Sequence, residues 1–142
     1  MGVISKITRF LPGTLLCSCF LSQAAVAGPD IQSWTTANGA RVLFVAAPDL
    51  PMVDVRVVFD AGSARARDTA GLADLTNRLL NDGAGSWDAD QIAERLEDVA
   101  AQLSLGSEQD MAWASLRTLT EEHAFARSME TLAAVLARPN FE

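Results

Sequence analysis

The chain of 142 residues carries 11 Lys and Arg residues against 18 Asp and Glu residues, a formal net charge of −7 at pH 7. Proteins that bind nucleic acid need a basic surface, so this balance excludes nucleic acid as an expected partner. The length fits one small domain, and 49% hydrophobic residues can supply its core.

Residues 1–27 are predicted to be a secretory signal peptide. Lys6 and Arg9 form a basic start, residues 10–20 form an apolar run, and Ala25-Val26-Ala27 fits the small-x-small cleavage pattern. The apolar run is too short to span a bilayer, so no stable membrane span is expected. The mature chain, residues 28–142, should therefore be periplasmic or secreted.

Two other interpretations of this leader stay open. A buried helix is one, although Pro12-Gly13 inside the run argues against it. The other is a lipoprotein, because the sequence around Cys17 and Cys19 resembles a cleavage box that would leave Cys19 lipidated. Cleavage after Ala27 leaves no cysteine, and nine Arg residues against 18 acids give a charge of −9.

The first part of the mature chain, up to residue 60, is predicted to form β-strands. Residues 33–36 and 41–46 flank Asn38-Gly39, which is a strong two-residue hairpin signal. The second of these strands is apolar on both faces, which predicts a central place in its sheet. Residues 52–60 alternate, with one apolar face made by Val53, Val55, Val57 and Phe59.

Helices and strands then follow in mixed order. A helix is expected from Gly71 to about Asn81, with a core stripe of Leu72, Leu75, Leu79 and Leu80. A second helix should start at Asp88, where Gln91 three residues on completes a capping box, and run to about Ala101.

Two further strands are expected at residues 103–105 and 111–116, and a helix over residues 120–137 capped by Thr120. The order of strands and helices predicts an α+β two-layer domain, with helices on one face of a mostly antiparallel sheet. The ending at Pro139-Asn140-Phe141-Glu142 suggests a domain that is truncated at its C-terminus.

Three segments carry a resemblance to a known family. Residues 51–63 form an apolar strand that ends in Gly-Ser, and Gly71-Leu-Ala-Asp-Leu-Thr-Asn-Arg78 follows a short loop. Residues 100–110 and 132–141 continue the pattern. Together they resemble the N-terminal domain of the insulinase/pitrilysin-type zinc peptidases, or inverzincins, which include the mitochondrial processing peptidases.

The zinc motif of that family is degenerate here. The resemblance places His, Glu and His at positions that read Asp74, Asn77 and Arg78. Arginine has no lone pair for a metal, and asparagine cannot act as a general base. No catalytic residue, metal ligand or cofactor is therefore expected in this chain. Asp74 and Arg78, four residues apart, can either pair or lie solvated and unpaired.

Other candidate residues carry weaker signals. The family's Asn-Ala pair, which implies peptide contact, corresponds to Ser104 and Leu105. His123 lacks a second imidazole four residues away, so a solvated position is expected rather than a zinc site. The three tryptophans, Trp34, Trp87 and Trp113, are expected to be packing anchors. For Trp113 the alternative is an edge strand on which it contacts a peptide.

The resemblance implies a non-catalytic half of a peptidase, which would help to form a peptide-binding chamber for a zinc-bearing subunit of the same family. One alternative is a peptide-binding or scaffold protein without a peptidase partner. The other is an active enzyme whose site, including the family's further Glu ligand, lies in sequence beyond residue 142.

Overall fold

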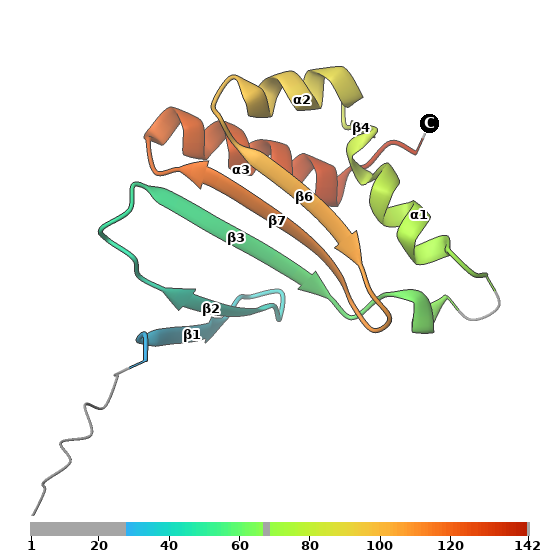
Figure 1. The fold of residues 1–142 in the computed structure, drawn as a ribbon, viewed down its shortest axis with the longest axis horizontal. Coiled ribbons are helices and arrows are strands. Elements are labelled where there is room, and N and C mark those ends of the chain that lie inside the picture. Colours follow the sequence, from blue (N-terminus) through green and yellow to red (C-terminus); the bar gives the residue numbers. More distant parts are fainter. Residues whose placement is uncertain (1–27, 67–68, 142) are drawn as a thin grey trace, which may run out of the picture. The chain divides into compact units, whose positions relative to one another are not determined.

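The computed structural model describes residues 28–66 and 69–141, which fall into two compact units on either side of Ala46 (Figure 1). The leader predicted at residues 1–27 and the cleavage site after Ala27 lie outside the described residues. The secretory and lipoprotein interpretations therefore remain predictions.

The first unit is a β-hairpin of β1 (Ile31–Thr35) and β2 (Arg41–Val45), in which Ile31 lies opposite Val45. Its loop is longer than the predicted two residues, since Thr35 pairs with Arg41. The Thr36 N–H bonds the Ala40 carbonyl at 2.9 Å. Among the described strands β2 pairs with β1 alone, so the prediction of a central strand is wrong.

The second unit is built on an antiparallel sheet in the order β3-β7-β6. The strands are β3 (Met52–Phe59), β6 (Gln102–Ser107) and β7 (Ala112–Leu119). The register places Leu116 of β7 between Val55 of β3 and Leu103 of β6. Alternate residues therefore form two faces, and the face with Leu116 is the apolar one.

Helices α2 (Ala89–Glu97) and α3 (Glu122–Ala137) cover this apolar face (Figure 1). Leu116 is 1% exposed and Val135 of α3 is fully buried, so the core lies between the sheet and the helices. The α+β class, with helices on one face of an antiparallel sheet, is confirmed. Among the described residues, no helix has both the length and the apolar character to cross a membrane.

The helix starts follow the expected chemistry at α2 but not at α3. The Asp88 carboxylate accepts the Gln91 N–H at 2.8 Å, and the Gln91 side chain accepts the Asp88 N–H at 3.1 Å, which confirms the capping box. At α3 the predicted cap Thr120 is wrong. The Glu121 carboxylate caps this helix by accepting the N–H groups of His123 and Ala124 at 3.0 and 2.8 Å.

An arginine of α2 fastens α2 to α3. The Arg95 guanidinium lies 3.8 Å from the centroid of the Trp87 ring and donates to Glu130 at 2.6 Å and to Thr131 at 3.2 Å. Its side chain is only 19% exposed. This half-buried arrangement supports the prediction that Trp87 is a packing anchor.

The segment before α2 differs from its prediction. The helix expected over residues 71–81 is α1 (Leu72–Arg78) followed by the 3₁₀ helix η2 (Leu79–Asn81). A small hairpin of β4 (Gly83–Ala84) and β5 (Trp87–Asp88) follows. The predicted core stripe is wrong at its start, because Leu72 and Leu75 are 47% and 55% exposed. Leu72 borders an open pocket instead of filled core.

Gly62 lies between β3 and the 3₁₀ helix η1 (Ser63–Arg65), where the chain contacts the turn between β6 and β7. Gly62 has a φ of 107°, and the N–H groups of Ser63 and Ala64 donate to the carbonyls of Glu108 and Gln109 at 2.9 and 2.8 Å. The loop that leads toward α1 is thereby fixed to the turn between β6 and β7.

Candidate functional site

Helix α1 carries the three degenerate motif positions and packs against β6 (Figure 1). Gly71 precedes it in the left-handed conformation, with φ of 82°, and accepts the Leu75 N–H at 2.9 Å. The structure therefore brings the motif helix and the strand with the predicted peptide contacts side by side.

Asp74 and Arg78 form an ion pair on the outer surface of α1. The Arg78 Nε lies 2.9 Å from the Asp74 Oδ2, with the side chains 75% and 55% exposed. Of the two interpretations left open by the sequence, the structure shows the pair. Exposed pairs at this spacing contribute about 0.2–0.5 kcal/mol, so this one is a weak stabilising contact.

Asn77 lies apart from this pair. It is 6% exposed, the single buried residue of α1, and it lines a pocket. No pattern in the sequence indicated this burial, because the leucine stripe favoured a different inner face of the helix. An asparagine here can donate and accept hydrogen bonds, but it cannot take a proton from water at neutral pH.

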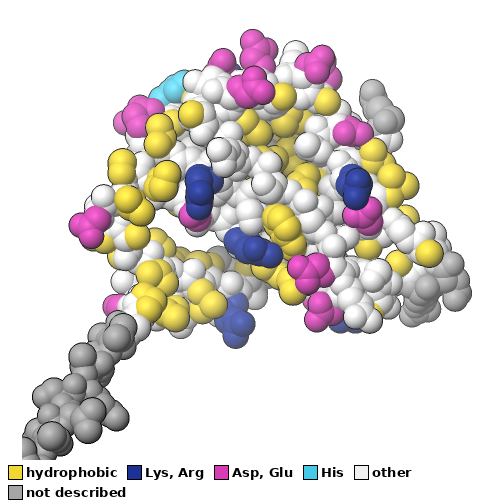
Figure 2. Space-filling model, viewed as in Figure 1, with side chains coloured by type: hydrophobic (Ala, Val, Ile, Leu, Met, Phe, Trp, Pro, Cys, Tyr) yellow, Lys and Arg dark blue, Asp and Glu magenta, His cyan; other side chains and the backbone are white. Residues whose placement is uncertain are grey.

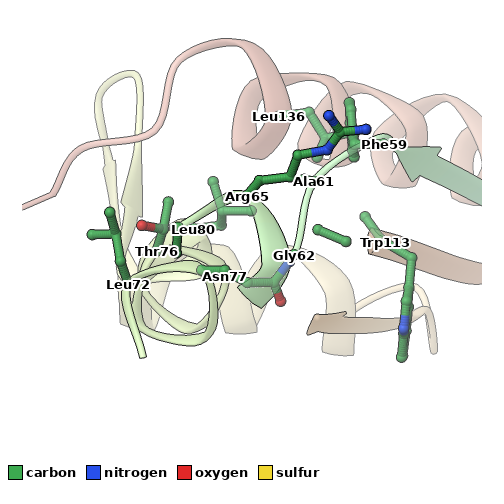
Figure 3. Close-up of a pocket in the computed structure, with 14 residues that line it drawn as sticks. Phe59, Ala61, Gly62, Arg65, Leu72, Thr76, Asn77, Leu80, Trp113 and Leu136 are labelled. Atoms are coloured by element: carbon green, nitrogen blue, oxygen red, sulfur yellow. The ribbon is translucent and has the colours of Figure 1, made fainter. Parts of the chain in front are cut away.

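The pocket beside Asn77 has a volume of about 440 Å³ (Figure 3). In Figure 3, Leu72, Thr76 and Leu80 of the α1–η2 segment lie on one side, and Phe59 and Trp113 from the strands lie on the other. Among the described residues its lining holds no His, Cys, Asp or Glu, and Arg65 is its one charged side chain. The pocket is therefore lined mostly by apolar side chains and is suited to an apolar group.

The donor atoms at the motif do not fit zinc. A zinc site uses three or four nitrogen, sulfur or oxygen ligands, and Asp74 offers one carboxylate that is already held by a fixed cation. Within residues 28–66 and 69–141, no three His, Cys, Asp or Glu side chains come close enough together to hold a metal.

The two predicted substrate-binding residues lie on opposite faces of β6. Ser104 lies opposite Ser115 of β7 and is exposed, on the face away from the helices. Leu105 lies opposite Ala114 and is half-buried toward the core. In the three-stranded sheet β6 is an edge strand. Because alternate residues of a strand face opposite sides, only Ser104 of the pair projects on the uncovered face.

The remaining candidates are placed as follows. His123 lies exposed in the first turn of α3, as predicted. Trp34 is 49% exposed and tilted against Phe44, with ring centroids 6.5 Å apart. Trp113 is half-buried, but it lies on β7, the central strand, so the prediction of an edge strand is wrong.

The sheet face away from the helices has two side-chain contacts that the sequence did not predict. Arg117 Nε and Nη2 donate to the two carboxylate oxygens of Asp54 at 2.7 and 2.9 Å. The Arg56 guanidinium lies 4.5 Å from the centroid of the Trp113 ring. The alternation in residues 52–60 did predict a polar face here, but strand register was needed to find the partners on β7.

Among the described residues, two carboxyl groups have lowered pKa values. Hydrogen bonds from the Arg117 side chain lower the pKa of Asp54 from its ordinary 3.8. The backbone N–H groups of Ala124 and His123 lower the pKa of Glu121 from its ordinary 4.5. Both groups therefore favour the folded chain when they are ionised.

These shifts predict a loss of stability in acid. A carboxyl whose pKa is lower in the folded chain stabilises it above the unfolded pKa, and this stabilisation is lost as the pH falls through the folded pKa. We expect the urea midpoint to decrease below about pH 4.5, the ordinary pKa of Glu121. The double variant Asp54→Asn, Glu121→Gln should show a smaller decrease between pH 5 and pH 3. An unchanged decrease would contradict these assignments.

Comparison with known proteins identifies the family. The sequence profile of the insulinase family, peptidase family M16, matches residues 41–142. The crystal structure of a peptidase M16 inactive domain from Pseudomonas fluorescens is 41% identical, with a TM-score of 0.77 over 80% of this chain and 27% of that chain. A protease from Helicobacter pylori, 19% identical with a TM-score of 0.68 over 80% of this chain and 27% of that one, supports the fold alone.

No curated protein matches the chain. It spans about a quarter of the length of the two solved structures, 27% of each. The profile match over residues 41–142 and the identity to the Pseudomonas domain are sufficient for an assignment. The chain belongs to the insulinase family of peptidases, family M16.

Proposed function

We propose that this chain is a non-catalytic M16 domain that helps to form a peptide-binding chamber for a zinc-bearing subunit of the same family. The observation that carries the proposal is the Asp74–Arg78 ion pair, which occupies the positions where the zinc motif has its two histidines. The description of the Pseudomonas fluorescens relative as an inactive domain agrees with it.

The chemistry at the motif supports loss of catalysis. A guanidinium stays protonated and has no lone pair, so Arg78 repels a dication rather than binding it. Asn77 at the position of the general base cannot activate water. Catalysis in an assembly of this kind would come from another domain or subunit of the family, which holds the zinc.

Peptide holding is supported by the place of β6 in the sheet. In the three-stranded sheet β6 is an edge strand beside the motif helix, and a peptide can add to such an edge through backbone hydrogen bonds. Backbone pairing accepts many sequences, so this mode suits a chamber that takes varied peptides. A zinc-bearing partner would then cut a peptide that both subunits hold.

The first test is metal binding and proteolysis by the purified chain. We expect no bound zinc by elemental analysis and no cleavage of unfolded protein substrates, with or without added zinc. The double variant Asp74→His, Arg78→His is the matched control, because two imidazoles four residues apart on one helical face should give a measurable zinc affinity. Zinc-dependent cleavage by the unmodified chain would contradict the proposal.

The second test is the partner. A tagged chain isolated from its native cells should carry a relative with an intact His-x-x-Glu-His motif, and the reconstituted pair should show zinc-dependent cleavage of peptides. The partner alone should cleave them more slowly. Equal cleavage by the partner alone would remove the chamber role and favour a scaffold.

A further inference from the structure

The face of the β3-β7-β6 sheet away from the helices, here called the open face, has an ordered arrangement of side chains. Figure 2 views the second unit from this side, and basic, acidic and hydrophobic side chains lie together on it. The strand register gives three cross-strand rows, which are Val58–Trp113–Gly106, Arg56–Ser115–Ser104 and Asp54–Arg117–Gln102.

Trp113 is fixed in this arrangement from two sides. A Cβ atom at Gly106 would lie 2.4 Å from the Trp113 ring, so the glycine leaves the space in which the indole lies across β6. The Arg56 guanidinium lies over the same ring, 4.5 Å from its centroid. The indole therefore connects all three strands and supports the guanidinium.

Arg56 differs from the other arginine of the open face. Arg117 is held by both carboxylate oxygens of Asp54. Arg56 forms no ion pair with the acids of the described residues, and its side chain is exposed. Stacking on a ring covers the flat face of a guanidinium and leaves the N–H groups at its edge available to a carboxylate.

The charge of the open face is opposite to that of the helix layer. The open face has two arginines against one aspartate. Helices α2 and α3 with their caps Asp88, Asp98, Glu121 and Arg138 carry eight acids against three arginines. The Debye length is about 8 Å at physiological ionic strength, so charges further away than this act weakly on a ligand at Arg56.

We propose that the open face binds an extended peptide segment through an acidic side chain, with the carboxylate at Arg56 and a neighbouring apolar side chain against Trp113 or Val58. Ser115 and Ser104 lie in the same row as Arg56, and their hydroxyls can bond the peptide next to the carboxylate. The inference rests on the proposed function and adds to it a selective side-chain contact on the open face, two strands away from the β6 edge at which a peptide backbone can pair.

The experiment measures binding of fluorescent peptides to the full chain by anisotropy. Three peptides of equal length carry Glu, Gln or Lys at one central position and are otherwise the same. We expect the Glu peptide to bind about tenfold more tightly than the Gln peptide, as for a charge-assisted contact, and the Lys peptide most weakly. The Glu preference should decrease with added salt.

Variants separate the open face from the rest of the chain. Arg56→Gln should remove the preference for Glu over Gln, and Arg56→Lys should keep only part of it, because lysine has the charge without the planar fork. Arg138→Gln is the matched control, since Arg138 is an exposed arginine beyond the end of α3. It should keep the full preference, and thermal unfolding confirms that each variant is folded.

The outcomes distinguish the two proposals. Equal binding of the Glu and Gln peptides, or a Glu preference that survives Arg56→Gln, overturns the acidic-peptide inference and leaves the chamber role standing. Failure of all three peptides to bind overturns the peptide-holding role itself, and the inference with it.

Discussion

Replacing Gly62 with alanine should lower the free energy of unfolding by about 2–5 kcal/mol, because backbone strain and overpacking act together. A Cβ atom there would lie 2.5 Å from the Glu108 carbonyl oxygen and 2.8 Å from both the Gln109 oxygen and the Met111 nitrogen. All three are backbone atoms of the β6–β7 turn, so none can move away without breaking the turn. Urea denaturation at pH 7 measures the change.

Gly71→Ala is the matched control for this prediction. Gly71 also has a positive φ, 82°, but apart from its chain neighbours no heavy atom of the described residues lies within 4 Å of the position that its Cβ would take. Gly71→Ala should lower the free energy of unfolding by only about 1–2 kcal/mol, the penalty for a left-handed residue with a side chain. Equal losses for the two variants would show that the contact with the turn adds nothing.

Replacing Leu116 with alanine should lower the free energy of unfolding by about 2–5 kcal/mol, the range for removing a buried leucine side chain and leaving a cavity. Leu116 is 1% exposed and lies between Val55 and Leu103 in the sheet register, so close packing surrounds it. The measurement is again the urea midpoint together with its slope, which should stay unchanged if only stability is altered.

Leu119→Ala on the same strand tests whether burial is the cause. Leu119 is 40% exposed at the end of β7, so its loss should cost about 1 kcal/mol or less. A cost for Leu119→Ala as large as that for Leu116→Ala would contradict the placement of the core between the sheet and the helices.

The sequence predicted the elements of the second unit well where periodicity and caps agreed. The alternation of residues 52–60 became β3, and the Asp88–Gln91 capping box starts α2 as expected. The helix over residues 120–137 was also found, although its cap is Glu121 rather than Thr120. Glutamate is a rarer cap than threonine, so local preference pointed one residue too early.

Tertiary contacts decided the rest. The leucine stripe of α1 predicted Leu72 and Leu75 as core, but the structure exposes both and buries Asn77. Helical spacing alone cannot show which face of a short helix meets a neighbour, because that depends on β6, which comes about 30 residues later.

The candidate site was partly readable from sequence. The degenerate motif was found from the order of residues 71–78, and the i,i+4 spacing allowed the Asp74–Arg78 pair. The contact between Arg56 and Trp113 could not be predicted, since 57 positions separate them and only the pairing of β3 with β7 makes them neighbours.

The position of Trp113 across Gly106 also provides an optical reporter. With Trp34 and Trp87 replaced by phenylalanine, the single remaining indole of the described residues would emit from the open face alone. Its emission wavelength depends on the water and charge around the ring, so displacement of the Arg56 side chain should be visible in the spectrum. Movements on this side of the sheet could then be followed in real time, separately from unfolding of the helix layer.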